Sequence, residues 1–198
     1  MFAPVVKLAL LHVFLAICAL EGWNVQQMDI KSAYLNVPIT EDIYMSQPKG
    51  FEEVGRETLV AKLNKGLYGL KQAGREWYGT LRNFLISIGF RWTHADHSVF
   101  VFERGSSIII IPVYVDDKLL AGNDERALDS IQAQISTCFK ASNLGTTSWI
   151  LGIWVLSRTV TPPAYSDTSH VLFRLTPTSS HALLLVTRTT PVDRKSVV

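Results

Sequence analysis

The sequence predicts a mixed α/β fold of the α+β kind, in which helices back a small antiparallel sheet. Three observations support it: an apolar run near the N-terminus, a stretch with a helical period, and a tight hairpin of two apolar strands. The chain has 198 residues, of which 47% are hydrophobic and 18% charged. That length and composition favour a single globular domain with a sizeable core.

The first expected element is a buried helix over residues 5–20, apolar on most sides and ended by Gly22. Lys7 and the apolar run after it also resemble a secretory signal. The run is too short to span a membrane, His12 interrupts it, and no small-residue cleavage site follows. We therefore expect a core helix, with a signal segment as the alternative.

Short strands and a second helix are expected next. Residues 24–30, 43–45 and 60–63 have strand-like patterns, and a turn is expected over residues 48–50. Residues 71–88 have a helical period, with one apolar face formed by Trp77, Leu81, Phe84, Leu85 and Ile88. Gly89 is expected to end this helix.

The third group of elements contains the hairpin. Residues 98–102, 108–115 and 118–121 are predicted strands, and Asp116 and Asp117 are the expected tight turn between the last two. Pro112 lacks a backbone donor, which predicts an edge strand or a bulge there. A helix over residues 124–139, capped by Asn123, and a last apolar strand over 149–156 complete the prediction. The inward positions of that helix are Leu128, Ile131, Ile135 and Phe139.

Composition divides the chain into two regions: residues 1–156 form the predicted folded domain, and residues 157–198 a poorly ordered tail. The tail has 14 Ser or Thr and 4 Pro among its 42 residues and shows no persistent period. Cys18 and Cys138 lie in apolar patterns without a CxxC motif, so both are expected to be buried free thiols in a reducing compartment. The net charge of +2 does not by itself indicate nucleic-acid binding. Residues 61–95, however, contain six basic and one acidic side chain, which suits either a phosphate-facing surface or an ordinary solvated helix face.

The adjacent carboxylates of Asp116 and Asp117 are the sharpest chemical feature. Like charges on an apolar hairpin repel each other, and a divalent cation would neutralise them. An ordinary Asp-Asp turn is the alternative. Asp29, at the end of the strand over residues 24–30, could complete a cluster of three carboxylates. Phosphoryl transfer with two metal ions requires such a cluster.

Four motifs in this order resemble the copia-type reverse transcriptase family: MDIKSAYLN at 28–36, IYMSQPKGF at 43–51, GLYGLKQAGREWY at 66–78 and YVDD at 114–117. FAPV at 2–5 and LGI at 151–153 fit as well, so the resemblance covers about residues 1–156. It implies a polymerase palm-type sheet with incomplete fingers. It also implies RNA-directed DNA synthesis from dNTPs on an RNA or DNA template-primer, with Mg²⁺ as cofactor and Mn²⁺ as a possible substitute.

The resemblance assigns a role to each matching residue. Asp29, Asp116 and Asp117 would be the catalytic metal ligands. Tyr34 would stack under the incoming sugar and exclude a ribose 2′-hydroxyl, the alternative being a core aromatic. The other implied contacts are Gln72 with the nucleotide, Lys71 and Arg75 with phosphates, Val115 with the primer end, and Gly152 near the primer-holding hairpin. For Lys71 and Arg75 a plain surface helix is an equal alternative.

Some residues depart from the family pattern. A basic fingers segment that precedes Phe2 in the family is missing, which suggests a truncated chain. Lys118 follows Asp-Asp where a hydrophobic residue is usual, and could pair with Asp116 or Asp117 in competition with metal. Asn143 stands where Asp is common. The rival interpretation is therefore an inactive retrotransposon-derived fragment with at most weak nucleic-acid binding. The expected location is intracellular, in the cytoplasm, a virus-like particle or the nucleus, without membrane contact; the oligomeric state stays open.

Overall fold

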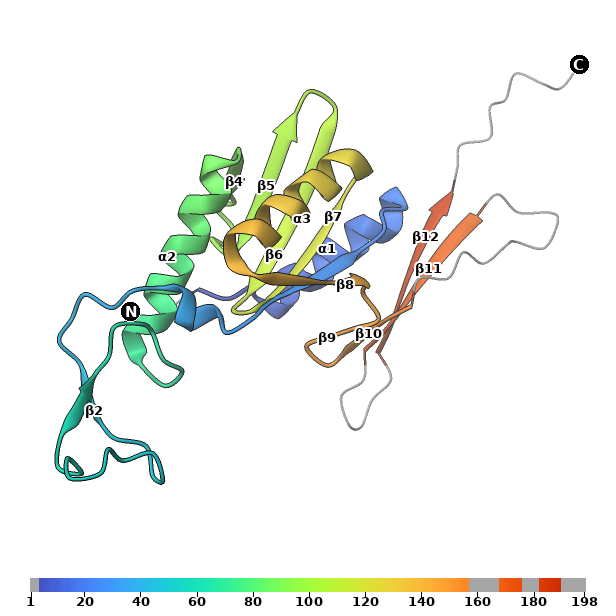
Figure 1. The fold of residues 1–198 in the computed structure, drawn as a ribbon. Helices are drawn as coiled ribbons and strands as arrows, with labels where there is room; N and C mark the ends of the chain where they lie inside the picture. Colours follow the sequence, from blue (N-terminus) through green and yellow to red (C-terminus); the bar gives the residue numbers. More distant parts are fainter. Residues whose placement is uncertain (1–3, 157–167, 176–181, 190–198) are drawn as a thin grey trace, which may run out of the picture.

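The structure is a computed structural model that describes residues 4–156, 168–175 and 182–189. Its centre is a six-stranded sheet in the order β4-β5-β6-β7-β1-β8, in which all neighbouring strands are antiparallel (Figure 1). The strands are β1 (Gln26–Ile30), β4 (Phe90–Trp92), β5 (Val99–Arg104), β6 (Ser107–Tyr114), β7 (Asp117–Gly122) and β8 (Ala141–Thr146). The predicted mixed α/β class with an antiparallel sheet is confirmed.

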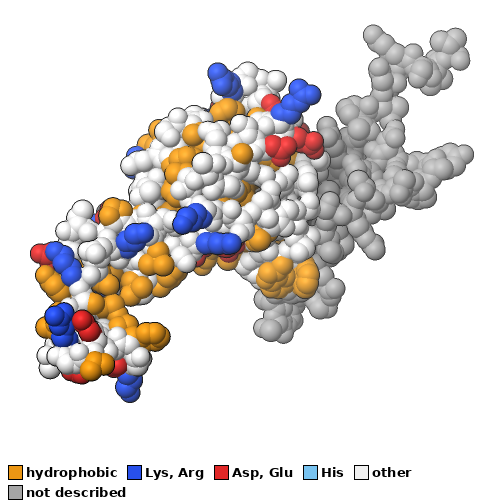
Figure 2. Space-filling view, in the orientation of Figure 1, with side chains coloured by type: hydrophobic (Ala, Val, Ile, Leu, Met, Phe, Trp, Pro, Cys, Tyr) orange, Lys and Arg blue, Asp and Glu red, His pale blue; other side chains and the backbone are white. Residues whose placement is uncertain are grey.

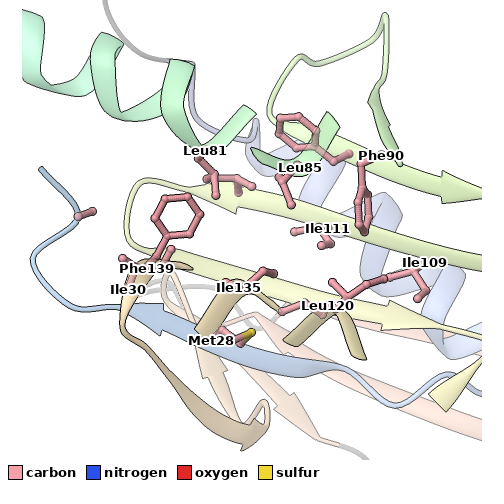
Figure 3. Close-up of a cluster of buried hydrophobic side chains, with 14 of the residues drawn as sticks. Met28, Ile30, Leu81, Leu85, Phe90, Ile109, Ile111, Leu120, Ile135 and Phe139 are labelled. Atoms are coloured by element: carbon pink, nitrogen blue, oxygen red, sulfur yellow. The ribbon is translucent and has the colours of Figure 1, made fainter. Parts of the chain in front are cut away.

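Two helices cover one face of this sheet: α2 (Lys71–Ser87) and α3 (Glu125–Phe139). Figure 3 shows Leu81 and Leu85 of α2 converging with Ile135 and Phe139 of α3 on the sheet. The sheet contributes Met28, Ile30, Ile109, Ile111 and Leu120 to the same cluster. The predicted inward face of α3 is confirmed, since Leu128, Ile131, Ile135 and Phe139 are all buried.

Helix α1 (Leu8–Glu21) covers the opposite face (Figure 1). Its buried side chains Leu11, Phe14 and Leu15 pack in one cluster with Leu119 and Ala121 of β7. The helix ends at Gly22, whose φ of 70° is the left-handed conformation that glycine adopts without a Cβ clash. The core helix expected here is therefore confirmed, and within the described residues no helix is long and apolar enough to cross a membrane.

A separate two-stranded sheet, β2 (Tyr44–Ser46) and β3 (Val60–Lys62), projects away from the main sheet (Figure 1). The 3₁₀-helix η1 (Ala33–Asn36) leads from β1 towards it. The long loop between β2 and β3 exposes apolar side chains, and Phe51 and Val54 are 84% and 94% exposed. This projecting unit therefore has little core of its own.

Several details differ from the sequence expectations. Strands β4 and β8 were not predicted, and the expected strand over 149–156 is a hairpin of β9 (Trp149–Ile150) and β10 (Ile153–Leu156). Its turn, Leu151 and Gly152, has φ values of 46° and 83°, which a continuous strand cannot contain. Cys138 is exposed rather than buried, because it lies on the outer side of α3; Cys18 is buried as predicted.

Two further corrections concern polar and proline positions. The N-cap of α3 is Asp124, whose carboxylate accepts a 3.0 Å hydrogen bond from the backbone N–H of Ala127. Asn123 instead accepts from Ile108 N–H at 2.7 Å, tying the helix entrance to β6. Pro112 lies in an interior strand without a bulge: the β6–β7 pairing resumes in the same register, from Ile110 opposite Ala121 to Val113 opposite Lys118. The sheet tolerates the missing donor by a local gap in the pairing.

The predicted tail, residues 157–198, lies mostly outside the described residues. Two strands within it are described, β11 (Thr168–Leu175) and β12 (Ala182–Thr189), in a sheet of order β12-β11-β10-β9. The sequence showed no period that would predict them.

Candidate active site

The sheet brings together three carboxylates from distant parts of the chain. Asp29, near the end of β1, is the direct cross-strand partner of Asp117, the first residue of β7. Asp116 precedes Asp117 in the β6–β7 hairpin, and its carbonyl oxygen accepts a 3.0 Å hydrogen bond from Ile30 N–H. Directly opposite residues in an antiparallel pair point to the same face of the sheet, so Asp29 and Asp117 are neighbours there.

The hairpin loop is one residue earlier than expected. Tyr114 pairs with Asp117, so the two loop residues are Val115 and Asp116, and Asp117 belongs to the strand. Val115 has a φ of 52°, a left-handed conformation that a β-branched residue rarely adopts. Strained backbone of this kind persists only where the surroundings hold it in place.

Three donors from other elements hold the two loop carbonyls. The indole N–H of Trp77 donates to Val115 O at 3.0 Å, and Ile30 N–H donates to Asp116 O. The ammonium of Lys118 donates to Asp116 O at 2.8 Å and to Val115 O at 3.3 Å. The loop that bears Asp116 is therefore fixed from α2, β1 and β7 together.

Lys118 is the most unusual residue of the site because it is only 1% exposed. Its ammonium lies 5.4 Å from the centre of the Trp77 ring, on the α2 side of the sheet. Burial lowers the pKa of Lys118 from 10.5 to about 7, an effect opposed by the charges of Asp116, Asp117 and Asp29. The sequence left open an ion pair of Lys118 with Asp116 or Asp117, and among the described residues no such pair is found. Lys118 donates to the loop carbonyls instead, because its position alternates with Asp117 and its side chain faces the other side of the sheet.

The Asp116 carboxylate has one occupied and one free oxygen. Its Oδ2 accepts a short hydrogen bond from the hydroxyl of Tyr68, whereas its Oδ1 is buried and has no hydrogen-bond partner. Burial raises the pKa of Asp116, and the negative charges of Asp29 and Asp117 act in the same direction. The Tyr68 hydrogen bond and the charge of Lys118 act to lower it.

The carboxylate oxygens of Asp116 and Asp117 are ligands of the kind that a hard divalent cation prefers, but they are not positioned to coordinate one without rearrangement. Asp116 Oδ1 is a buried acceptor that a cation would satisfy, and carboxylates are preferred ligands of Mg²⁺. Asp117, however, accepts a 3.1 Å hydrogen bond from the Gln27 amide. Over the described parts of the chain, no three His, Cys, Asp or Glu side chains are grouped so that they could hold a metal without rearrangement.

Aromatic side chains lie beside the carboxylates. The ring centres of Tyr34, in η1, and Tyr68 are 4.4 Å apart with an interplanar angle of 39°. Tyr34 also lines a small apolar pocket together with Val115 and Trp77. Burial, followed by the charge of Asp116, raises the pKa of Tyr34. Tyr34 is thus a half-buried ring that packs against the main core and lies at the edge of the acidic cluster.

Comparison with known proteins identifies the family. Residues 1–162 match the family model described as reverse transcriptase (RNA-dependent DNA polymerase). The chain belongs to this reverse transcriptase family. It is 42% identical over 152 residues to the retrovirus-related Pol polyprotein from transposon RE1 of Arabidopsis thaliana, an alignment that covers 77% of the chain and 10% of the relative.

Other relatives point the same way. The Pol polyprotein from transposon TNT 1-94 of Nicotiana tabacum is 40% identical over 157 residues, with 78% of this chain and 12% of the relative covered. The transposon Ty1-BL Gag-Pol polyprotein of Saccharomyces cerevisiae is 33% identical over 129 residues, covering 63% and 7%. These relatives confirm the copia-type resemblance, and the chain spans about a tenth of the plant polyproteins. No solved structure matches the chain.

The remaining predicted contacts of the reverse transcriptase domain lie at the start of α2. Lys71 is exposed and Gln72 half-buried, in the first turn of the helix. Arg75 is paired with Glu76 at 2.8 Å and with Glu41 at 3.6 Å, so two carboxylates occupy its guanidinium. Lys and Arg side chains are spread along the face seen in Figure 2 rather than gathered in one patch. Gly152, expected near the primer, lies in the β9–β10 turn.

Sequence reasoning missed Tyr68, Gln27 and Trp77 as partners of the acidic cluster. Tyr68 and Trp77 lie within the motif over residues 66–78, but no spacing rule assigns either to the hairpin loop. Gln27 could have been found, because it lies two residues before Asp29 on the same face of the strand.

Proposed function

We propose that this chain forms the palm and part of the fingers of an RNA-directed DNA polymerase, which transfers a nucleotide from a dNTP to a primer 3′-hydroxyl. The observation that carries the proposal is the pairing of Asp29 with Asp117 beside Asp116. A cluster of carboxylates from separate strands has a high electrostatic cost unless cations bind to it. An RNA or DNA template-primer and a dNTP are the proposed partners.

Mg²⁺ is the proposed cofactor, with Mn²⁺ as a substitute, and Asp29, Asp116 and Asp117 would hold it. When bound in a two-metal arrangement, it would lower the pKa of the primer hydroxyl and stabilise charge on the oxygens of the displacement. The unpartnered Oδ1 of Asp116 is the oxygen best prepared for this role. Asp117 would first have to give up its hydrogen bond from Gln27.

The substrate contacts are proposed from the places of the side chains around this cluster. Tyr34 has its ring beside Tyr68 and Asp116, where it can lie under an incoming sugar and exclude a 2′-hydroxyl. Val115 would face the primer end, and Gln72 the nucleotide. Lys71 is free to approach phosphates, whereas Arg75 would have to exchange Glu41 and Glu76 for them.

Primer extension on an RNA template with Mg²⁺ tests this function. We expect the chain to extend the primer, and the double variant Asp116→Asn/Asp117→Asn to lose about a hundredfold or more of the rate, since metal ions supply several kcal/mol of charge stabilisation. Asp129→Asn, an exposed position of α3, is the matched control and should keep full activity. Equal extension by the double variant would refute the proposed role of the carboxylates.

A second candidate is a non-catalytic fragment that binds nucleic acid weakly. It is favoured by the buried ammonium of Lys118 beneath the loop and by the ion pairs of Arg75 with Glu41 and Glu76, both of which depart from a site ready for substrate. The same assay separates the two candidates: extension that depends on Asp116 and Asp117 rules out the inactive fragment. Absence of extension, together with weak and salt-sensitive binding of a template-primer, supports it.

A further inference from the structure

The hydroxyl of Tyr68 contacts Asp116, and its ring packs against Tyr34. We infer that Tyr68 is a positioning residue that orients the Asp116 carboxylate for a divalent cation and supports the Tyr34 ring for the sugar. This inference rests on the proposed function and deepens it, because it assigns a role to a residue that the sequence motifs left without one.

The hydrogen bond from the Tyr68 hydroxyl gives the two carboxylate oxygens of Asp116 different roles: one anchors the side chain, and the other is left for a cation. Oδ2 is occupied by the Tyr68 hydroxyl, and Oδ1 remains buried without a partner in the described structure. A carboxylate anchored through one oxygen cannot rotate freely, so the other oxygen is presented in a fixed direction. The hydrogen bond also favours the ionised carboxylate, against the burial that raises the pKa of Asp116.

The second contact is between rings. The centroids of Tyr34 and Tyr68 are 4.4 Å apart, within the range of favourable aromatic pairs. Tyr68 is half exposed, so its ring is not required to fill the core. The Tyr68 ring instead packs against the Tyr34 ring and supports it from one side.

The backbone explains why Tyr68 stays in this place. Gly66 N–H donates to Val37 O at 2.9 Å, which ties the segment before Tyr68 to the end of η1. A Cβ at position 66 would lie 2.5 Å from the carbonyl oxygen of Tyr34. Only glycine permits this close approach, and the approach keeps Tyr68 beside Tyr34.

The two contacts can be removed separately. Tyr68→Phe deletes the hydroxyl and keeps the ring, whereas Tyr68→Leu deletes both. Tyr44→Phe removes a tyrosine hydroxyl from the separate β2–β3 sheet and serves as the control. Binding of Mn²⁺ to the full chain, followed by electron paramagnetic resonance, measures the first contact. The ratio of dNTP to rNTP incorporation in primer extension measures the second.

We expect Tyr68→Phe to weaken Mn²⁺ binding by about tenfold, the size of a lost hydrogen bond to a charged group, and to keep sugar selection. Tyr68→Leu should lose sugar selection as well, by about three- to tenfold, the size of an aromatic pair. The Tyr44→Phe control should match the wild type in both measurements.

The outcomes that overturn the inference are distinct from those that overturn the proposed function. If the wild type binds Mn²⁺ and Tyr68→Phe binds it equally well, Tyr68 is not a positioning residue. If Tyr68→Phe binds Mn²⁺ more tightly, Tyr68 blocks the site instead, and the inference is wrong in sign. If the wild type shows no Mn²⁺ binding that Asp116→Asn removes, the proposed function falls and the inference falls with it.

Discussion

The two faces of the six-stranded sheet differ in where they place charged side chains: one face buries a cation, and the other leaves carboxylates partly accessible to solvent. On the face covered by α2 and α3, Met28 pairs with Lys118, and both side chains are fully buried. One residue further, Asp29 pairs with Asp117, and both are partly accessible to solvent. Because successive side chains of a strand point to opposite faces, the ammonium of Lys118 lies on the other side of the sheet from the Asp29 and Asp117 carboxylates. Lys118 therefore supports the loop without forming an ion pair with Asp116 or Asp117.

The largest expected difference between the two faces is in stability. Met28→Ala removes a fully buried side chain from the core and should lower the free energy of unfolding by about 2–5 kcal/mol. Asp29→Asn, its neighbour on the other face, should change it by less than about 0.5 kcal/mol or raise it slightly, because Asp29 is close to other negative charges. Urea denaturation of both variants measures this difference. Equal losses would show that the two faces are not distinct.

Lys118→Met replaces a buried ammonium by an apolar side chain of similar length. Near pH 7 it should raise the free energy of unfolding by about 1–4 kcal/mol, since a buried charge can be less stable than a well-packed apolar residue. The lost donor to the loop carbonyls opposes this gain, so primer extension should not improve in parallel.

The gain from Lys118→Met should depend on pH. The pKa of Lys118 is about 7 in the folded chain and 10.5 as a free side chain, so between these values the unfolded state binds more protons. The cost of burying Lys118 is therefore complete below pH 7 and declines as the pH rises towards 10.5. Denaturation of both proteins at pH 6, 7, 8 and 9 should show the stability difference shrinking above about pH 7. A constant difference would contradict the lowered pKa.

The smallest expected difference between the two faces is in the reactivity of the cysteines and involves no change in the free energy of unfolding. Burial raises the pKa of Cys18, on the buried side of α1, to about 12, whereas Cys138 is exposed on α3. A thiol reagent at pH 8 should label Cys138 in the native chain and Cys18 only after denaturation. Cys138→Ser should abolish the native labelling. Rapid labelling of Cys18 would show that α1 does not hold its face of the sheet closed.

Much of the fold could be predicted because local patterns and tertiary contacts agree. The face of α3, the hairpin of β6 and β7, and the stop at Gly22 follow from periodicity and turn chemistry. Strand β8 was missed because residues 141–146 (ASNLGT) have no alternating apolar pattern and none of them is buried, and only pairing with β1 makes them a strand. Asn123 and Asp124 are both residue types that cap helices well. Asp124 is the cap in the structure, because the Asn123 side chain accepts a hydrogen bond from Ile108 of β6 instead.

The candidate site was predictable in its carboxylates but not in their partners. The sequence placed Asp29 at a strand end and Asp116 and Asp117 in a hairpin turn, and the sheet makes Asp29 the direct partner of Asp117. Tyr68 reaches Asp116 through a turn whose path depends on the packing of Gly66, which no sequence period encodes. The direction of Lys118 depends on whether Asp117 belongs to the loop or to the strand, and a shift of one residue reverses the face.

Binding of Mn²⁺ to the wild type and to Asp29→Asn tests most directly whether the β1 carboxylate and the hairpin form one cation site. We predict that the wild type binds Mn²⁺ and that Asp29→Asn weakens the affinity by about tenfold or more, because carboxylate charge dominates the affinity of such sites. Unchanged affinity in Asp29→Asn, or no binding by the wild type, would contradict the claim that the paired strands build the site.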